Sequence, residues 1–301
     1  NAPSINKIWA TNNEISEIDL TGLTNIYQLN LVNNNLHGEI DLTVLTKLHD
    51  TNLSNNKITN IKAQGLEELV AITANNNNLK NIEVDKTNKT LYSVTVNNND
   101  IESLKLNLPV ANRVEMKDNK LSDIDLSKLP KLETLYLSNI NGGSNTIKNI
   151  DISKNKELLD LRLSNVGLEK IDLNSETLRT LYADNNKLEK VNLKSSPKIK
   201  VVHLSSNNIS EIILPKMTAN KFGVMENTLN ELYVNYNNLK ELDIADYTSV
   251  STLQCAYNKL TNLEFKKDNI AGRTNPVFSP QVIEIEPEEK DGQKVIDLEK
   301  L

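Results

Sequence analysis

The stretch LRTLYADNNKLEKVNL, at residues 178–193, decides the fold of this chain. Its centre alternates apolar and polar residues with a period of two, which predicts a short β-strand with one buried face. The stretch follows the spacing L-x-x-L-x-L-x-x-N-x-L, where L is any aliphatic residue. The fixed positions of this frame are filled by Leu178, Leu181, Ala183, Asn186 and Leu188.

The same frame recurs from residue 5 to residue 265, mostly at intervals of 20 to 22 residues. Twelve repeats align, and eleven of them have asparagine at the ninth position, whereas one has Val166. Self-similarity at such a period indicates a stacked repeat architecture. The asparagines of this column are Asn13, Asn34, Asn56, Asn77, Asn99, Asn119, Asn145, Asn186, Asn207, Asn237 and Asn258.

A unit of this length holds one strand and one return segment. The return segment has about ten residues and its own alternating apolar pair, as in Ile171 and Leu173, so we expect an extended or 3₁₀ conformation. One unit cannot bury its apolar stripe alone, whereas stacked units bury a continuous core. The strands should therefore stack in parallel, about 4.8 Å apart, into one long sheet.

The asparagine column has a structural interpretation. The chain contains 47 Asn and 43 Leu, and asparagine is poor in helix interiors and strands, so it needs a regular place elsewhere. An inward carboxamide has two donors and one acceptor for the backbone groups that the turn leaves unpaired. We favour this role over a metal site lined by asparagine.

This frame is the leucine-rich repeat signature, and the short units resemble those of the internalin family, in particular repeats of the internalin J type. The resemblance is carried by segments such as Asn119–Leu126 (NKLSDIDL) and Asn186–Val191 (NKLEKV). It implies a right-handed solenoid of about 12 short repeats, with a parallel sheet on the concave face, a mostly extended or 3₁₀ convex side and little α-helix. It also implies a secreted or wall-attached location and an adhesive or ligand-binding role. One departure is that internalin J-like repeats stack Cys at the last apolar strand position, where this chain has Leu, Val, Ala, Met and, once, Cys255.

The two ends of the chain differ from the repeats. Residues 1–265 form the predicted repeat domain, and Asn1 without a signal-like apolar stretch suggests a processed product or an excerpt. Residues 266–301 leave the frame. Strands are expected at 282–286 and 294–298 around the turn signal Asp291-Gly292. This end is either a cap over the last repeat or the start of a further domain.

Two insertions interrupt the period. The interval of 26 residues contains extra residues at 140–144, just before the repeat with Val166. The interval of 30 residues lengthens the link at 215–228, where the spacing of apolar residues suggests one or two helical turns. A loop on a rigid scaffold often carries function, although a tolerated surface insertion explains this one equally well. The apolar residues of the link are Met217, Phe222, Val224 and Met225.

Composition and motifs exclude several classes of function. The net charge of -6 argues against non-specific nucleic-acid binding, and no apolar run is long enough to insert in a membrane. One cysteine and three dispersed histidines, His37, His49 and His203, suggest neither a disulfide nor a metal site. No cofactor-binding motif is present, so we expect no cofactor. A hydrolase-like enzyme using His203 with Asp184 is the weakest alternative, because no catalytic set accompanies them.

The frame also predicts which strand residues face outward. The residue between the last two strand apolars forms a column that begins at Trp9, is small or polar from Asn30 to Glu115, and turns aromatic and basic from Tyr136 onward. Tyrosine and arginine anchor interfaces, although tyrosine also simply stabilises strands. Asp160 lies in a neighbouring column on the same face. The candidate ligand-binding residues are Tyr136, Arg162, Tyr182, Asp184, His203, Tyr233, Tyr236 and Tyr257.

The sequence therefore predicts a non-enzymatic binding module of a secreted or cell-surface bacterial protein. It should recognise a protein or glycan ligand on its concave sheet, as a monomer. The main alternative is a structural spacer that displays another domain. The two differ in whether the tyrosine patch is contiguous and exposed or is covered by the 215–228 link.

Overall fold

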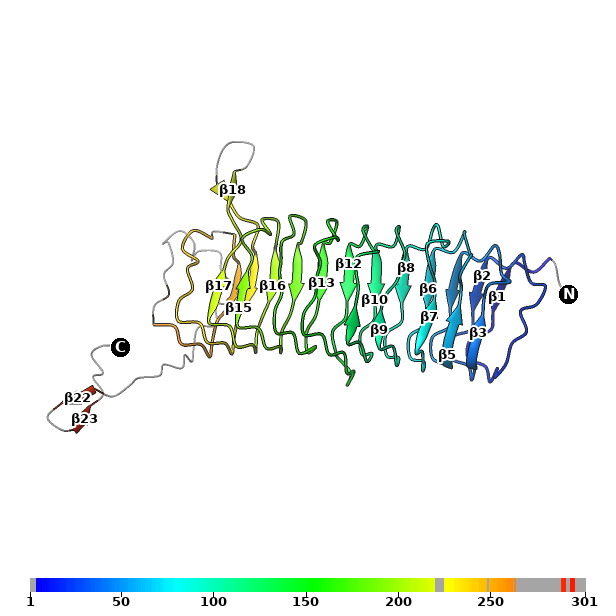
Figure 1. Ribbon diagram of the computed structural model, residues 1–301, viewed down its shortest axis with the longest axis horizontal. Coiled ribbons are helices and arrows are strands. Elements are labelled where there is room, and N and C mark those ends of the chain that lie inside the picture. Colours follow the sequence, from blue (N-terminus) through cyan, green and yellow to red (C-terminus); the bar gives the residue numbers. More distant parts are fainter. Residues whose placement is uncertain are drawn as a thin grey trace.

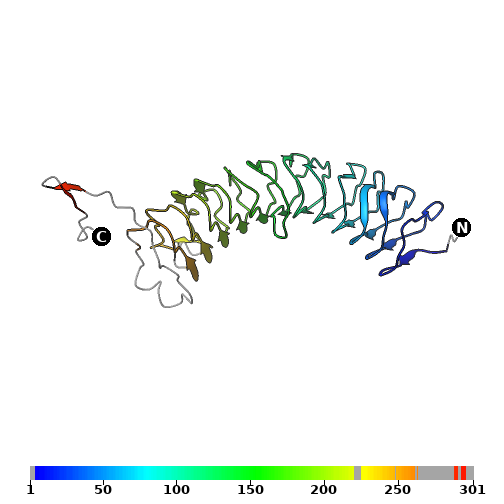
Figure 2. The same cartoon turned by 90° about the horizontal axis from the view of Figure 1, so that it is seen from below.

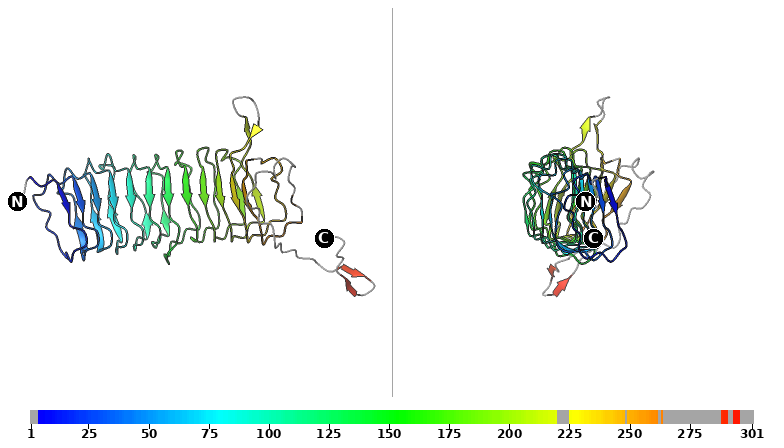
Figure 3. Two further views of the ribbon diagram at one scale, coloured as in Figure 1. Left: turned by 180° about the vertical axis from the view of Figure 1, so that it is seen from behind. Right: turned by 90° about the vertical axis from the view of Figure 1, so that its right-hand side faces the viewer.

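The computed structural model describes residues 4–219, 225–247, 249–261 and 263, and two short strands at 288–290 and 293–295. The described part is a curved solenoid (Figures 1 and 2). No α-helical or 3₁₀-helical residue occurs in the described ranges. No helix among them could cross a membrane. Viewed along the solenoid, the turns lie over one another (Figure 3).

Twelve parallel strands form one sheet, and Figure 2 shows that this sheet lines the inner side of the arc. Each strand has three residues, and each comes from one of the twelve predicted repeats. In spatial order they are β1 (Lys7–Trp9), β2 (Gln28–Asn30), β4 (Asp50–Asn52), β6 (Ala71–Thr73), β8 (Ser93–Thr95), β10 (Arg113–Glu115), β12 (Thr134–Tyr136), β13 (Asp160–Arg162), β14 (Thr180–Tyr182), β16 (Val201–His203), β20 (Glu231–Tyr233) and β21 (Thr252–Gln254).

The return segments are extended, and several pair as short strands on the convex side. They form one three-stranded and two two-stranded parallel sheets among the described residues. Of the two conformations expected for the return segment, the extended one is found. These strands are β3 (His37–Asp41), β5 (Lys57–Lys62), β7 (Asn81–Glu83), β9 (Ser103–Leu104), β11 (Asp123–Ile124), β15 (Lys190–Asn192) and β17 (Glu211–Ile213).

The core lies between the two layers and runs the length of the solenoid. The middle residue of each concave strand points into it, and Leu135, Leu161 and Leu181 have no exposed surface. Cys255 also faces the core and is fully buried, and burial raises the pKa of its thiol to about 11. At this position it acts as a small apolar residue rather than as a reactive thiol.

The asparagine column forms the predicted ladder between repeats. Asn56 Nδ2 donates to the carbonyl oxygen of Leu53 in its own repeat (3.0 Å) and of Leu31 in the preceding repeat (2.9 Å), while Oδ1 accepts from Leu36 N–H (3.0 Å). Asn145 keeps this role despite the preceding insertion, because it bonds to Met116 and Leu137. Asn13 is different. It is exposed, and its side-chain amide bonds only to Thr11 O among the described residues, which include no earlier turn beneath it.

A second asparagine chain, which the repeat frame did not predict, lies one residue earlier, on the surface. Asn12, Asn33, Asn55, Asn76 and Asn98 each hydrogen bond to the next through their side chains at 2.6–2.7 Å. All five have positive φ angles, between 54° and 58°. Asparagine tolerates this left-handed backbone better than most residues, which explains its place here. We call this position, in all repeats, the turn position.

The first insertion is organised by one carboxylate. Asp118 occupies the turn position, and its Oδ1 accepts from the N–H groups of Ile140 (2.5 Å), Asn141 (2.9 Å) and Gly143 (3.2 Å). The bulge therefore folds back onto the preceding repeat. Gly143 sits directly against the backbone there, because a Cβ on Gly143 would lie 2.1 Å from Asp118 Cα.

The second insertion corrects one expectation. The link at 215–228 contains no helical turn among its described residues and instead forms an antiparallel strand pair, β18 (Thr218–Ala219) and β19 (Met225–Glu226). Met217 precedes the first strand and Met225 begins the second, whereas Phe222 and Val224 lie outside the described residues. The spacing of apolar residues was compatible with a helix, but the chain must leave the solenoid and return to the start of β20, which a hairpin accomplishes in few residues.

At the C-terminal end, β22 (Glu288–Lys290) and β23 (Gln293–Val295) pair antiparallel. Of the two strands expected here, the one at 294–298 overlaps β23 in the described part. Residues 282–286 lie outside the described part. The division of the chain at residue 265, and the choice between a cap and a further domain, stay predictions.

The ladder predicts a specific stability difference. Replacing Asn56 with alanine should lower the free energy of unfolding by about 1–3 kcal/mol, because buried turn groups lose their partners. Asn13→Ala, the same substitution at an exposed ladder position, should change it by no more than about 0.5 kcal/mol. Urea denaturation midpoints measure both. Similar losses for the two variants would contradict the bridging role.

The close approach at Gly143 predicts a second difference. Gly143→Ala should cost about 3 kcal/mol, because the new methyl group collides with the backbone of Asp118. Gly142→Ala should cost about 1 kcal/mol, since Gly142 has a φ of 87° but open space around it. Thermal unfolding of both variants tests this. An effect at Gly143 as small as that at Gly142 would show that the bulge does not pack as described.

Candidate functional site

The concave sheet places one residue of each repeat in a single outward column. The pairings join the third residue of every strand to the third residue of the next, so the column follows the order expected from the frame. We call it the central column. From the N-terminus it holds Trp9, Asn30, Asn52, Thr73, Thr95, Glu115, Tyr136, Arg162, Tyr182, His203, Tyr233 and Gln254.

The rings of the C-terminal half form one continuous stack. Tyr182 and His203 have ring centroids 4.2 Å apart, and His203 and Tyr233 have centroids 4.0 Å apart, each pair with an interplanar angle of 23°. The Arg162 guanidinium lies 4.8 Å from the Tyr182 centroid on one side and 4.4 Å from the Tyr136 centroid on the other. The structure thus brings five of the predicted binding residues into direct contact.

The cationic part of the stack is held in place by a carboxylate. Arg162 donates twice to Asp160, at 3.1 and 3.0 Å, and Tyr136 OH donates to the same carboxylate at 2.6 Å. Burial and the bond to Asp160 raise the pKa of Tyr136 to about 12, so this phenol stays protonated at neutral pH. A bidentate arginine has little freedom left to lose on binding.

The stack extends further than sequence reasoning indicated. Arg113, the first residue of β10, places its guanidinium 5.4 Å from the Tyr136 centroid, and Lys117 Nζ lies 5.8 Å from it. Both pair with Glu115, which is largely buried in the central column. Among the positions beside the central column, sequence reasoning selected acidic and tyrosine residues and missed these two cations, which reach Tyr136 from neighbouring positions.

His203 does not have the surroundings of a catalytic histidine. Its Nδ1 is 3.8 Å from Asp184 Oδ2, which is too long for a hydrogen bond, and Tyr182 and Tyr233 cover both ring faces. Burial lowers the pKa of His203, and repulsion from Arg162 lowers it further. Asp184 has a structural bond instead, because its Oδ1 accepts from Ser205 N–H at 2.8 Å. Burial raises the pKa of Asp184, which opposes a role as a partner for a protonated imidazole.

Tyr236 and Tyr257 form a separate pair at the turn position. Their rings are nearly parallel, with centroids 4.2 Å apart, and the side chains are 54% and 38% exposed. Both have a φ of 55°, a left-handed backbone that is unfavourable for a bulky residue. Within the described part of the chain no ring contact joins this pair to Tyr233, so the predicted residues form two groups rather than one.

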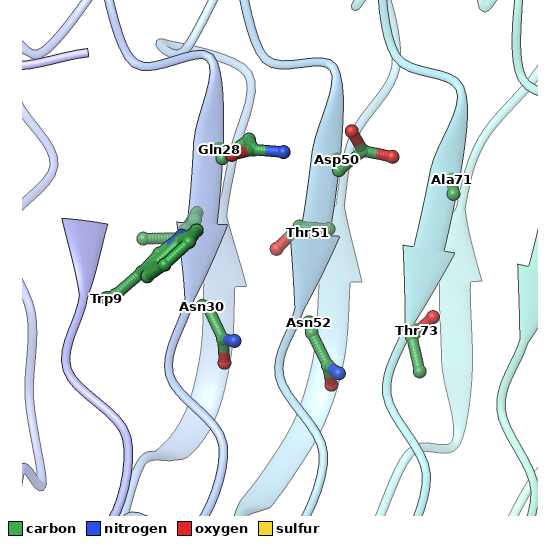
Figure 4. A pocket seen from close by; sticks show the side chains of 9 residues that line it. Trp9, Gln28, Asn30, Asp50, Thr51, Asn52, Ala71 and Thr73 are labelled. Atoms are coloured by element: carbon green, nitrogen blue, oxygen red, sulfur yellow. The ribbon is translucent and has the colours of Figure 1, made fainter. Parts of the chain in front are cut away.

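The N-terminal end of the concave face has a shallow hollow of about 230 Å³. Figure 4 shows Trp9 at one side of it and the outward side chains of β2, β4 and β6 along the other. Trp9 is 70% exposed. Sequence reasoning placed Trp9 in the central column but found no site there, because the residues that follow it are small and polar.

Among the described residues, no group of three or more His, Cys, Asp or Glu side chains could hold a metal ion. A scan of the sequence against protein families finds no match, and neither does a search of curated proteins.

Solved structures do share the fold. The functional domain of InlJ from Listeria monocytogenes, described as including a cysteine ladder, is similar with a TM-score of 0.61 and 18% identity, over 91% of this chain and 68% of that one. YopM from Yersinia enterocolitica has a TM-score of 0.69 and 18% identity, over 97% of this chain and 64% of YopM. A Toll chain from the Drosophila Toll–Spatzle complex has a TM-score of 0.63 and 18% identity, over 80% of this chain and 36% of Toll. The internalins thus include structural neighbours of this solenoid, although it lacks the cysteine stack. Together with the repeat frame, these likenesses establish that the chain has the leucine-rich repeat solenoid fold.

Proposed function

We propose that this chain is a non-enzymatic binding module that recognises a macromolecular ligand, a protein rather than a glycan, on the C-terminal half of its concave sheet. The observation that carries the proposal is the stack of Tyr136, Arg162, Tyr182, His203 and Tyr233, which we call the aromatic stack. The chain acts as a monomer and belongs to a bacterial protein that is secreted or held at the cell surface.

The chemistry of the aromatic stack suits an interface. Tyrosine and arginine bury much area with few rotatable bonds, and both are enriched among the residues that dominate binding energy. Here the side chains are already fixed by their neighbours, so little conformational entropy is lost when a partner covers them. Phenol and guanidinium edges supply the polar contacts that fix orientation.

The fold supports the same class of function. Leucine-rich repeat solenoids present a long curved surface, and the Toll chain described above is seen in complex with the protein Spatzle. This chain spans only 36% of that Toll chain, so the comparison supports a mode of binding and not a particular partner.

A spacer that only displays another domain is the competing function. A spacer requires a stable solenoid, but it does not require aromatic and cationic residues in register on one half of one face. The strand pair β18–β19 leaves the solenoid at its edge, in the link that leads to β20 (Figure 1). The contiguous stack therefore favours binding.

The proposal is tested by truncating side chains of one column. Three substitutions should each raise the dissociation constant for the ligand by about tenfold or more, as expected for hot-spot residues: Tyr182→Ala, Tyr233→Ala and Arg162→Ala. The ligand is found first, by probing arrays of secreted and surface proteins and of glycans with the purified chain. Calorimetry then measures the dissociation constants.

Thr95→Ala is the matched control, because Thr95 occupies the same column on β8 outside the stack. It should leave affinity within about twofold. Equal losses at Thr95 and Tyr182 would indicate damage to the sheet rather than a local site. If neither array yields a ligand whose binding is weakened by the stack variants, the result would support the spacer function.

The titration of His203 provides a further check on the stack. Its pKa should lie below the ordinary value of 6.5, because burial and Arg162 disfavour the charged ring. The neutral ring is favoured in the folded state, so this contribution to stability is complete above about pH 6.5 and is lost as the pH falls toward the folded pKa. The pH dependence of the imidazole NMR signals measures it.

The Arg162→Gln variant should raise the pKa of His203, while leaving it below the ordinary value because burial remains. A pKa at or above 6.5 in the unmodified chain would contradict the described burial of the imidazole, and a pKa unaffected by this variant would contradict its repulsion by the guanidinium.

A further inference from the structure

We propose that the N-terminal hollow of the concave face is a separate binding site for a neutral saccharide, centred on Trp9. The hollow lies between the indole of Trp9 and the outward side chains of β2, β4 and β6 (Figure 4). Its volume of about 230 Å³ is below the roughly 300 Å³ at which sites for drug-sized ligands begin, so it fits one or two sugar rings rather than a larger ligand.

The first argument is the exposure of Trp9. It is the single tryptophan of the chain, and 70% of its surface is open to solvent. The neighbouring residues Ile8 and Ala10 already face the core, so the indole is not needed to fill it. Lys7 Nζ lies 5.9 Å from the ring centroid and leaves most of the ring open. A flat exposed indole matches the apolar face of a pyranose ring, whose C–H groups pack against its π surface.

The second argument is the set of hydrogen-bonding groups beside the indole. Asn30 Oδ1 accepts from Val32 N–H at 3.3 Å, and Asn52 Oδ1 accepts from Ser54 N–H at 3.1 Å. These bonds fix both carboxamides with their NH₂ groups unused by the described part of the protein. They form a pair of oriented donors on neighbouring strands, about 4.8 Å apart. Sugar hydroxyls at adjacent ring positions accept such bonds.

The third argument is a complementary acceptor. The Asp50 carboxylate lines the same hollow, and His49 Nδ1 holds one of its oxygens at 2.6 Å. His49 is itself stacked on Tyr27, with centroids 4.8 Å apart. The carboxylate is therefore positioned, and its other oxygen has no partner among the described residues. A ligand with several hydroxyl groups can satisfy donors and acceptors together.

The same features disfavour other ligands. A peptide binds through apolar or aromatic anchors in pockets, and the lining has one aromatic residue among small polar ones. A phosphate-bearing ligand needs cations, but the residues that line the hollow include no Lys or Arg, and the Asp50 carboxylate among them offsets Lys7 beside Trp9. One aromatic platform with amide donors and a carboxylate acceptor fits a neutral saccharide best.

The experiment uses the full chain and the fluorescence of Trp9, which reports on this site alone because the chain has no other tryptophan. The probes are three neutral hexasaccharides: hexa-N-acetylchitohexaose, cellohexaose and a β-galactan hexasaccharide. At least one should give a saturable change in emission. No saturable change with any of the three overturns the proposal.

Variants then locate the site for the hexasaccharide that binds, with affinity measured by calorimetry. Trp9→Ala should weaken binding by about tenfold or more, and Asn52→Ala by several-fold. Tyr92→Ala removes another exposed aromatic residue, 50% open to solvent and outside the hollow, and should have no effect.

Tyr182→Ala separates this site from the aromatic stack. Unchanged saccharide binding in Tyr182→Ala, with loss in Trp9→Ala, supports two independent sites. Loss in Tyr182→Ala with none in Trp9→Ala assigns the sugar to the aromatic stack and overturns the proposal, while leaving the proposed binding function intact. Loss in both variants with unchanged melting temperatures means a single extended site, which also contradicts a separate one.

Discussion

A buried carboxamide that joins each repeat to the one before it is the interaction on which the rest of this structure depends. Where the chain leaves a concave strand, the carbonyl groups of two successive turns face the core, and no sheet hydrogen bond can reach them. An asparagine side chain such as that of Asn56 bonds to both, and also accepts from the backbone of the preceding repeat. Unpaired groups at this depth would be costly, so each turn is held at one height and one rotation relative to the last.

This constraint fixes the register of the concave sheet, and the register makes a surface of columns. The third residue of each concave strand pairs with the third residue of the next strand, from Trp9 to Gln254. Chemically similar side chains in adjacent repeats must then lie about 4.8 Å apart. Aromatic rings can close this gap by tilting, as the 4.0 Å separation of His203 and Tyr233 shows. Charged groups of one sign would repel at that spacing, and here Tyr136 separates Arg113 from Arg162, each of which has its own carboxylate.

The periodic part of the fold was predictable from the sequence because one spacing determines strand, turn and core together. The position of Tyr182 in its repeat was enough to place it beside Arg162 and His203. Features that depend on a single repeat were not predictable. Helical turns were expected in the 215–228 link, but its described residues form a strand pair. No spacing revealed that Asp118 would organise the 140–144 bulge. The exposed asparagine chain was also missed, because the left-handed turn that favours it is a property of the backbone and not of apolar periodicity.

The turn position holds an unfavourable residue in the last two repeats. In nine of the eleven left-handed turns the residue is Asn, Asp or Ser, whereas Tyr236 and Tyr257 occupy the last two. A tyrosine there carries a backbone strain that asparagine largely avoids, on the order of 1–2 kcal/mol. The two rings stack and recover part of that cost, but asparagines at the same places would bond to each other, as Asn33 and Asn55 do. Because asparagine would relieve this backbone strain and keep a side-chain bond, the presence of tyrosine argues that the phenol side chains have a function. The pair lies just beyond the strands that carry Tyr233 and Gln254, so a ligand that covers the aromatic stack and continues past the end of those strands would reach it.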